Sequence, residues 1–270
     1  MDNRVSVSMS DGVADVRLVR ADKMNALDAA MFDGLVGTIE RLGREKGLRA
    51  VVLSGEGRAF CAGLDMGRFA AMKEGGGNGV AGGEKRDLRA RTHGLANFPQ
   101  QAVWGWRQLP VPVIAAIRGV AFGGGFQLAL GADIRFLAPD ARMSIMEIKW
   151  GLVPDMAGTP ILASLVRDDI LRELTFTGRI FSAQEALQYG LATRICEDPH
   201  AEAMQLAREI AGKSPDAIRA AKRMLNNLSV DPGPALLAES IEQQKLMGAP
   251  NQLEAVRANL EKRAPRFADV

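Results

Sequence analysis

Apolar and polar residues alternate over residues 5–9 and 13–19, on either side of Asp11-Gly12. This alternation predicts two strands with one buried face each, and Asp-Gly is a turn signal that joins such strands into a hairpin. Asp28 is placed to cap a helix that follows. The apolar face of that helix is made by residues at helical spacing, namely Met31, Leu35, Ile39 and Leu42.

Two apolar runs, residues 49–55 and 113–117, predict strands that are buried on both faces. Three glycines at 123–125 come after the second run, and residues 126–130 open a helix. Glycines at a turn from strand to helix let the backbone approach a ligand, because no Cβ is in the way. They also leave N–H groups free at a helix N-terminus, which stabilises negative charge.

The pattern around residues 123–125 separates two kinds of anion site. A dinucleotide site needs G-x-G-x-x-G with an acidic residue about 20 positions later, and a P-loop ends in Gly-Lys-Ser/Thr. Neither pattern is present here. What remains is a pair of N–H donors for one oxygen, an oxyanion hole for a carbonyl that gains charge. Taken alone, the stretch is equally explained by close packing of a helix against a strand.

Residues 58–65, which follow the first buried strand, repeat part of this pattern. The repeat consists of Ala59, Phe60 and Gly63, which match Ala121, Phe122 and Gly125 in relative position. Three identities are a weak repeat, but they suggest two similar strand-turn-helix units.

Residues 85–108 are predicted to form a long helix, after a glycine-rich stretch at 75–83 that is typical of a mobile connection. Its aromatic residues are expected in the core, or else in the wall of an apolar pocket, and they are Phe98, Trp104 and Trp106. His93 has no acid nearby in the sequence, so a structural role is expected for it.

Glu147 directly follows two predicted strands, at residues 133–138 and 142–145, and lies between Met146 and Ile148. If this carboxylate is buried, desolvation raises its pKa toward the range that suits proton transfer near neutral pH. An exposed acid at the end of a strand is the equal alternative.

The second half of the chain is predicted to be mostly helical. Helices are expected first at residues 160–166, 168–176 and 182–189, with a short strand at 192–195. Ser182 and Glu185 match a capping box. Four more helices with no strand between them are expected at residues 200–212, 215–228, 234–247 and 251–262. Their apolar faces suggest a subunit interface, and His200 is expected at the surface without a partner.

Composition narrows the function classes. The chain has 270 residues, 47% of them hydrophobic, which is enough for a large core. A net charge of +2 does not favour nucleic acid or an anionic membrane as a partner. Residues 1–10 do not resemble a signal peptide, and no apolar run is long enough to cross a bilayer. Cys61 and Cys196 are too few for a disulfide framework or a metal site, so a cytoplasmic location is expected.

The chain resembles the crotonase superfamily, also called the enoyl-CoA hydratase/isomerase family, over nearly its whole length. The resemblance is carried by segments in family order and spacing, residues 22–27, 60–65, 119–125 and 147–155. It implies an α/β fold, a spiral of repeated ββα units followed by a C-terminal all-helical segment. The implied division is an acyl-CoA-binding core at 1–198 and an oligomerisation segment at 199–270, in a homotrimer or a dimer of trimers.

The resemblance also implies an enzyme, a lyase or isomerase of fatty acid metabolism that acts on acyl-CoA thioesters. By family position, the backbone N–H groups of Leu64 and Gly124 form the oxyanion hole, and Glu147 is the acid or base. The positions implied to bind coenzyme A are Lys23, Ala26, Ala62, Asp65 and Met66. The alternative for Lys23 is a charged loop residue that is exposed to solvent and contacts no ligand. Coenzyme A is part of the substrate, so no separate cofactor is expected.

One departure from the family pattern affects the expected reaction. Gln127 stands where the hydratases carry a second glutamate, and an amide holds water but cannot exchange a proton with it. Asp155 lies four residues after Gly151, where some members place a working aspartate; a turn residue after Pro154 is the alternative.

Three hypotheses therefore stay open for the function. The first is an enoyl-CoA hydratase or isomerase, or a member that runs another acyl-CoA reaction with Asp155. The second is a catalytically silent acyl-CoA-binding member, which Gln127 invites. The third, a purely structural assembly protein, leaves the glycines and Glu147 unexplained.

Overall fold

The computed structural model describes residues 4–67, 87–213, 215–226 and 232–263. A six-stranded sheet forms its centre, with the strand order β1-β2-β3-β4-β6-β9. The strands are β1 (Val5–Ser10), β2 (Val13–Leu18), β3 (Ala50–Gly55), β4 (Val113–Ile117), β6 (Ile134–Leu137) and β9 (Arg194–Ile195). β1 and β2 pair antiparallel, and every further pair in this sheet is parallel. The predicted hairpin is confirmed, with Asp11 and Gly12 both at positive φ in its turn.

A second, three-stranded sheet has the order β5-β7-β8. Its strands are β5 (Val120–Phe122), β7 (Arg142–Ser144) and β8 (Phe181–Ser182). β5 follows β4 after a break at Arg118-Gly119, so the chain leaves the large sheet and enters the small one at this point.

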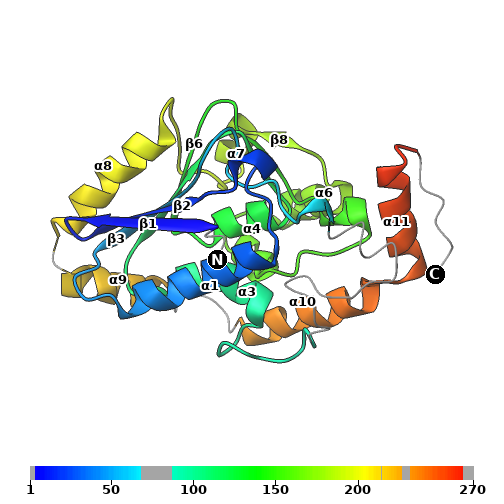
Figure 1. Cartoon of the computed structure of the whole chain (residues 1–270), viewed down its shortest axis with the longest axis horizontal. Helices are drawn as coiled ribbons and strands as arrows, with labels where there is room; N and C mark the ends of the chain where they lie inside the picture. The colour runs from blue at the N-terminus through cyan, green and yellow to red at the C-terminus, as the bar shows by residue number, and fades with distance from the viewer. Residues whose placement is uncertain (1–3, 68–86, 214, 227–231, 264–270) are drawn as a thin grey trace.

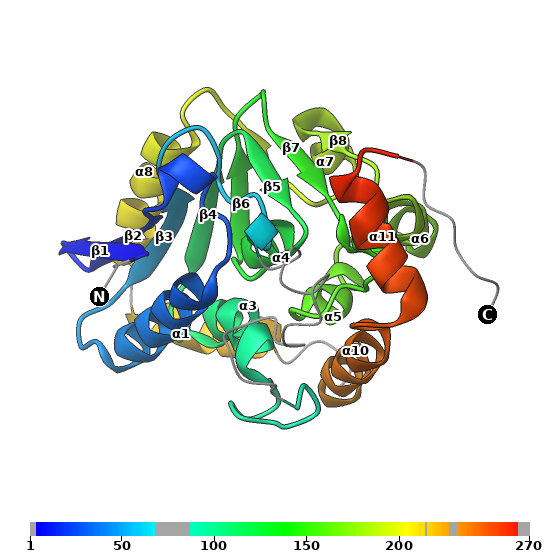
Figure 2. The ribbon, with the colours of Figure 1, turned by 45° about the vertical axis from the view of Figure 1, so that its right-hand side comes forward.

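Helices cover both faces of the large sheet. On one face lie α1 (Ala29–Arg44) and α3 (Phe98–Gln108), and on the other lies α8 (Pro199–Ala211) (Figure 2). Asp28 caps α1 by accepting a hydrogen bond from the Met31 N–H, as predicted. Each face of the sheet packs against its own hydrophobic core. Along β3, Val51 and Leu53 belong to the core under α1, and Val52 belongs to the core under α8.

The helix expected at residues 85–108 is shorter than predicted. It begins at Phe98, because Asn97 and Gln100 form a reciprocal capping box, and Pro99 follows at the start of the helix. Residues 87–97 form turns instead, with Gly94 at positive φ. Trp104 and Trp106 are buried in the core, which confirms the first of the two explanations for them. The connection predicted at 75–83 lies outside the described residues.

The remaining helices agree with the sequence pattern within a few residues. They are α4 (Gly124–Leu130), α5 (Gly158–Leu162), α6 (Asp168–Thr177), α7 (Ala183–Gln188), α9 (Pro215–Asn226), α10 (Gly233–Leu246) and α11 (Pro250–Leu260). The capping box at Ser182 and Glu185 is present. α5 starts and ends earlier than the predicted 160–166, because Ala157 in the left-handed region begins a new helix there.

Two buried polar contacts tie the C-terminal helices to the rest of the molecule. On α9, the Lys222 Nζ donates to the carbonyl of Val111 and to the Asp133 carboxylate, both at 2.8 Å. On α10, the buried Ser240 hydroxyl accepts from Asn97 Nδ2 at 2.8 Å. α10 and α11 consequently lie against the side of the molecule that is away from β1 (Figures 1 and 2). The division of the chain at residue 198 and the role of these helices in oligomerisation stay predictions.

His200 corrects one expectation. It lies in the first turn of α8, and its Nε2 is 3.0 Å from Asp15 Oδ1 on β2. The partner was not foreseen because 185 positions separate the two residues in the chain.

Candidate active site

The two repeated turns predicted from the sequence lie side by side. Cys61, in the turn after β3, forms an isolated parallel bridge with Ala121 on β5. The Phe122 N–H donates to the Cys61 carbonyl at 3.1 Å. A Cβ on Gly125 would lie 2.2 Å from that same carbonyl oxygen. Position 125 therefore requires glycine for the two turns to touch.

Leu64 and Gly124 bring their N–H groups to the place where these turns meet. A Cβ on Gly63 would lie 3.8 Å from the Gly124 nitrogen, so the residue before Leu64 adjoins the start of α4. Gly124 is the first residue of α4, and its N–H has no partner within the helix. The Leu64 N–H bonds to no backbone carbonyl in the described part of the chain, whereas both neighbouring residues pair with Leu27. Neither N–H group has a backbone acceptor in the described part of the chain, and their role as an oxyanion hole stays a prediction.

Glu147 lies directly beside this pair of donors. It opens a short 3-10 turn, η2 (Glu147–Trp150), and its Oε1 is 3.4 Å from where a Cβ on Gly123 would lie. Only 8% of the residue is exposed. Burial raises the pKa of the Glu147 carboxyl to about 7, against the lowering effect of hydrogen bonds from the backbone and from Gln127. Of the two alternatives that the sequence left open, the structure shows the buried one, and the group can take up or release a proton near neutral pH.

Gln127 holds Glu147 in this position. The Gln127 Nε2 donates to Glu147 Oε1 at 2.8 Å, and the Gln127 Oε1 accepts from the N–H groups of Met156 and Gly158, both at 2.9 Å. Because two backbone donors fix the amide oxygen, the amide nitrogen must face the carboxylate. Glu147 Oε2 has no hydrogen-bond partner among the residues described. Of the two carboxylate oxygens of Glu147, Oε1 therefore accepts a hydrogen bond from Gln127, and Oε2 accepts none from the described residues.

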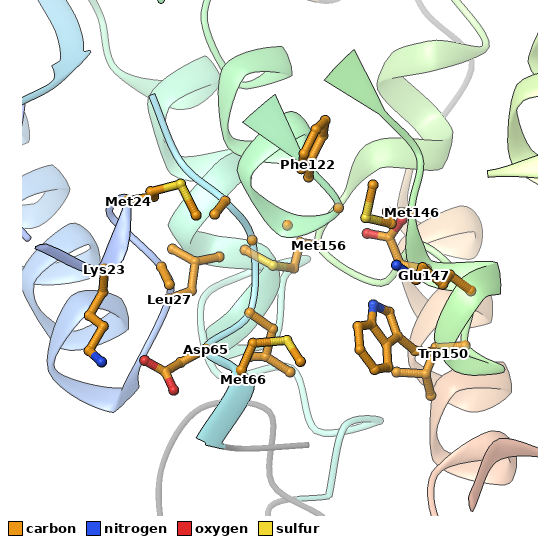
Figure 3. A pocket seen from close by; sticks show the side chains of 18 of the residues that line it. Lys23, Met24, Leu27, Asp65, Met66, Phe122, Met146, Glu147, Trp150 and Met156 are labelled. Atoms are coloured by element: carbon orange, nitrogen blue, oxygen red, sulfur yellow. The ribbon is translucent and has the colours of Figure 1, made fainter. Parts of the chain in front are cut away.

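These groups border a cavity of about 800 Å³. Its apolar lining residues are largely methionine, leucine and aromatic side chains, among them Met24, Leu27, Met66, Phe122, Met146, Trp150, Leu152 and Met156. Figure 3 shows Lys23, Met24 and Leu27 on one side of the cavity and Met146, Glu147 and Trp150 on the other. A largely apolar cavity with a few convergent polar groups is the usual form of a small-molecule site.

All the residues predicted to contact coenzyme A line this cavity, namely Lys23, Ala26, Ala62, Asp65 and Met66. Lys23 ends a short 3-10 turn, η1 (Ala21–Lys23), and its side chain is exposed. Asp65 is held by Arg20 Nη1 at 2.5 Å. Partial burial raises the pKa of Asp65, but the hydrogen bonds from Gly67 and Arg20 lower it further than burial raises it. The Asp65 carboxyl therefore stays ionised at neutral pH.

Asp155 also lines the cavity and is 5% exposed, so the structure places it beside the other predicted site residues. Gln127 is not among the lining residues of the cavity, but it is hydrogen-bonded to two residues that are, Glu147 and Met156.

Among the lining residues that were not predicted from the sequence are two on the C-terminal helices, Gln243 on α10 and Asn259 on α11. The Asn259 Nδ2 donates to the Lys149 carbonyl at 2.7 Å, which fixes α11 against η2. The sequence carries no local signal for either residue, because both come from helices distant in the chain.

Within the described residues, no group of three His, Cys, Asp or Glu side chains is arranged to hold a metal ion. The same residues contain no helix that is both long and apolar enough to cross a membrane.

Comparisons with known proteins agree with this geometry. The sequence profile described as enoyl-CoA hydratase/isomerase matches residues 8–270. The mitochondrial methylglutaconyl-CoA hydratase of Mus musculus is 31% identical over 264 residues, which cover 95% of this chain and 79% of the relative. The carnitinyl-CoA dehydratase of Proteus mirabilis is 32% identical over 275 residues, which cover 99% of each chain.

Among solved structures, an enoyl-CoA hydratase/isomerase from Mycobacterium paratuberculosis superimposes with a TM-score of 0.83 at 28% identity. The match covers 95% of this chain and 98% of that one. The α/β crotonase-like fold predicted from the sequence is thereby confirmed. The chain belongs to the enoyl-CoA hydratase/isomerase family.

Proposed function

We propose that this protein is an enzyme that processes acyl-CoA thioesters, of the enoyl-CoA hydratase/isomerase type. The observation that carries the proposal is a buried carboxyl whose pKa is raised to about 7, Glu147, in one apolar cavity with Leu64 and Gly124, the residues expected to form the oxyanion hole. An anion that forms in this cavity would be stabilised by the donors, while the carboxyl moves the proton. The family membership supports the same class of reaction.

In the proposed mechanism the thioester oxygen accepts hydrogen bonds from the N–H groups of Leu64 and Gly124. Polarising the carbonyl makes the α-proton removable, and the donors stabilise the enolate that forms. One such donor is typically worth about 3 kcal/mol, or roughly two orders of magnitude in rate. Lys23 and the other predicted coenzyme A positions would hold the remainder of the substrate at the mouth of the cavity, where a lysine favours a phosphate.

Glu147 performs the proton transfer in this proposal. Its Oε1 accepts the hydrogen bond from the Gln127 amide, which orients the carboxyl for the transfer. Moving a proton between two carbons of an enoyl group needs one such residue, and Glu147 suffices for double-bond migration.

Hydration is the second reaction that this site supports, with Asp155 as the observation in its favour. Adding water is easier with two proton-transferring groups, and Gln127 cannot be the second. Asp155 is a cavity-lining carboxyl that supplies the missing group. A silent acyl-CoA binder stays the alternative outside enzyme chemistry.

We further propose a homotrimer, or a dimer of trimers, assembled through the C-terminal helices, and a cytoplasmic location. The exposed apolar side chains of Leu237 on α10 and Leu260 on α11 support an interface there. Sedimentation of the purified protein measures the assembly, and a monomer at working concentration would contradict it.

The experiment that tests the function supplies the purified protein with 2-enoyl-CoA and 3-enoyl-CoA thioesters of several chain lengths. Water addition is followed by loss of the conjugated enoyl absorbance, and migration of the 3-enoyl double bond by its appearance. Saturated acyl-CoA binding is titrated in parallel by calorimetry. Turnover in either assay supports the enzyme. Tight binding without turnover identifies a silent binder, and the absence of both contradicts any acyl-CoA function.

A further inference from the structure

A second hollow, of about 360 Å³, shares no lining residue with the active-site cavity. It lies at the carboxyl ends of the parallel strands β2, β3 and β4, beside the start of α8. Its polar lining residues are Arg17, Ser54, Glu56, Arg118 and His200. The carboxyl edge of parallel strands is where open α/β sheets commonly bind ligands, and the volume falls within the range of small-molecule pockets, about 300–1,000 Å³.

The floor of this hollow is a row of residues in register across three strands. Arg17 on β2 pairs with Ser54 on β3, and Ser54 in turn pairs with Ala116 on β4. Ser54 shares the face of Val52, which packs toward α8, because side chains alternate along a strand. The small side chain of Ala116 leaves the space open between Ser54 and Arg118.

Ser54 is the feature that points to a ligand. It is 6% exposed, it lines the hollow, and its hydroxyl makes no hydrogen bond to another residue in the part of the chain that the structure describes. A serine hydroxyl can both donate and accept a hydrogen bond. A ligand oxygen in the hollow would supply the missing partner.

Two arginine side chains near Ser54 keep N–H donors that make no hydrogen bond to the described residues and could bind an anion. Arg17 donates Nε and Nη2 to Asp15 Oδ2, at 3.0 and 2.6 Å, which leaves its Nη1 unused. Arg118 donates only Nη2, to the Glu197 carbonyl at 3.0 Å. Asp15 is paired with Arg17, and the Nε2 of His200 lies 3.0 Å from Asp15 Oδ1.

Two further groups contribute charge at the hollow. Glu56 is exposed at the rim and is the other negative group that faces it. The N-terminus of α8, a helix of 13 residues, adds a partial positive charge.

We propose that this hollow binds the phosphate group of a small molecule, or free phosphate, between Ser54, Arg17 and Arg118. Arginine side chains suit phosphate because their planar guanidinium donates two parallel hydrogen bonds. The proposal concerns binding alone and does not depend on the proposed acyl-CoA reaction.

The test titrates the full-length protein by calorimetry with inorganic phosphate, glycerol 3-phosphate and glycerol, at constant ionic strength set with chloride. We expect the phosphate probes to bind and glycerol not to bind. Binding of inorganic phosphate alone assigns the hollow to the free ion, and tighter binding of glycerol 3-phosphate assigns it to a phosphorylated small molecule. If neither phosphate probe binds, the proposal is wrong.

Variants locate the binding. Ser54→Ala removes only the hydroxyl and should weaken phosphate binding about tenfold, the value of one hydrogen bond to a charged group. Arg118→Gln should weaken it by about tenfold or more. Arg172→Gln, on the exposed surface of α6, is the matched control and should leave the affinity unchanged. Wild-type affinity in both Ser54→Ala and Arg118→Gln would overturn the assignment even if phosphate binds elsewhere.

Discussion

The active-site cavity has two walls that are built in different ways. One wall consists of the turns after β3 and β5, with Leu64 and Gly124, whose backbone N–H groups we propose as the oxyanion hole. The other consists of η2, where a single side chain, Glu147, is held by a single amide, Gln127. The geometry of the first wall depends on how two segments of backbone pack together. The geometry of the second depends on the side chains of Glu147 and Gln127. A side-chain change should therefore be tolerated in the first wall, unless it adds a Cβ to a glycine, and should be severe in the second.

The largest effect is expected for Glu147→Gln. The variant keeps the shape of the side chain but removes the proton-transferring group, so the turnover of enoyl-CoA should fall about 10³-fold. Steady-state kinetics measure this loss, and titration with a saturated acyl-CoA should give an unchanged affinity. Retention of more than a tenth of the wild-type turnover would show that another group moves the proton.

The same variant should stabilise the fold, which separates loss of chemistry from loss of structure. In the folded protein the pKa of Glu147 is raised from 4.5 to about 7, so ionising it disfavours folding. The wild type therefore loses stability as pH rises from about 4.5 to 7. The glutamine in Glu147→Gln does not ionise, so the variant keeps this stability. The difference in the free energy of unfolding is roughly 3 kcal/mol at most. Denaturant unfolding at pH 8 and at pH 4.5 should show the advantage of the variant at pH 8 only.

The next effect tests the backbone wall. Gly125→Ala places a Cβ 2.2 Å from the Cys61 carbonyl oxygen, so the two turns must separate and the donors move apart. We expect turnover to fall about 10²-fold, the value of one oxyanion donor. Leu64→Ala is the matched control, because it keeps the backbone N–H, and it should change turnover less than about threefold. Wild-type turnover in Gly125→Ala would show that the backbone geometry of the two turns does not matter for the reaction.

A smaller effect is expected for Asp155→Asn. If Asp155 is the second proton-transferring group, hydration should fall about tenfold or more while double-bond migration changes little. Measuring the two reactions separately on one preparation gives the ratio. Asp22→Asn serves as the control, since Asp22 also lines the cavity but is exposed. An unchanged hydration rate in Asp155→Asn would leave Glu147 as the one working carboxyl in our account.

The contrast between the two walls also explains what could be predicted from the sequence. The backbone wall is encoded locally, because glycines at 63 and 123–125 follow strands with strong apolar patterns. Its position in the fold was therefore predictable. The burial of Glu147 was only half predictable, since its apolar sequence neighbours fitted both an interior and an exposed position.

Long-range contacts account for what the sequence did not predict. The orientation of Gln127 is set by N–H groups 29 and 31 residues away in the chain. The place of Gln243 at the cavity depends on how α10 docks, through Ser240 and Asn97. The predicted start of the helix at 85–108 was wrong, because the side-chain hydrogen bonds at Asn97 begin the helix at Phe98, later than helical periodicity suggests.

The pH dependence of kcat/KM tests the central claim most directly, which is that a buried Glu147 held by Gln127 transfers the proton. The wild type should gain activity as pH rises through a midpoint of about 7, because the ionised carboxylate is the base. Gln127→Met and Gln127→Glu both remove the amide donor that lowers this pKa, and Gln127→Glu keeps an acceptor for the N–H groups of Met156 and Gly158. Both midpoints should move to higher pH. A midpoint near 4.5 in the wild type, unchanged in both variants, would contradict the account.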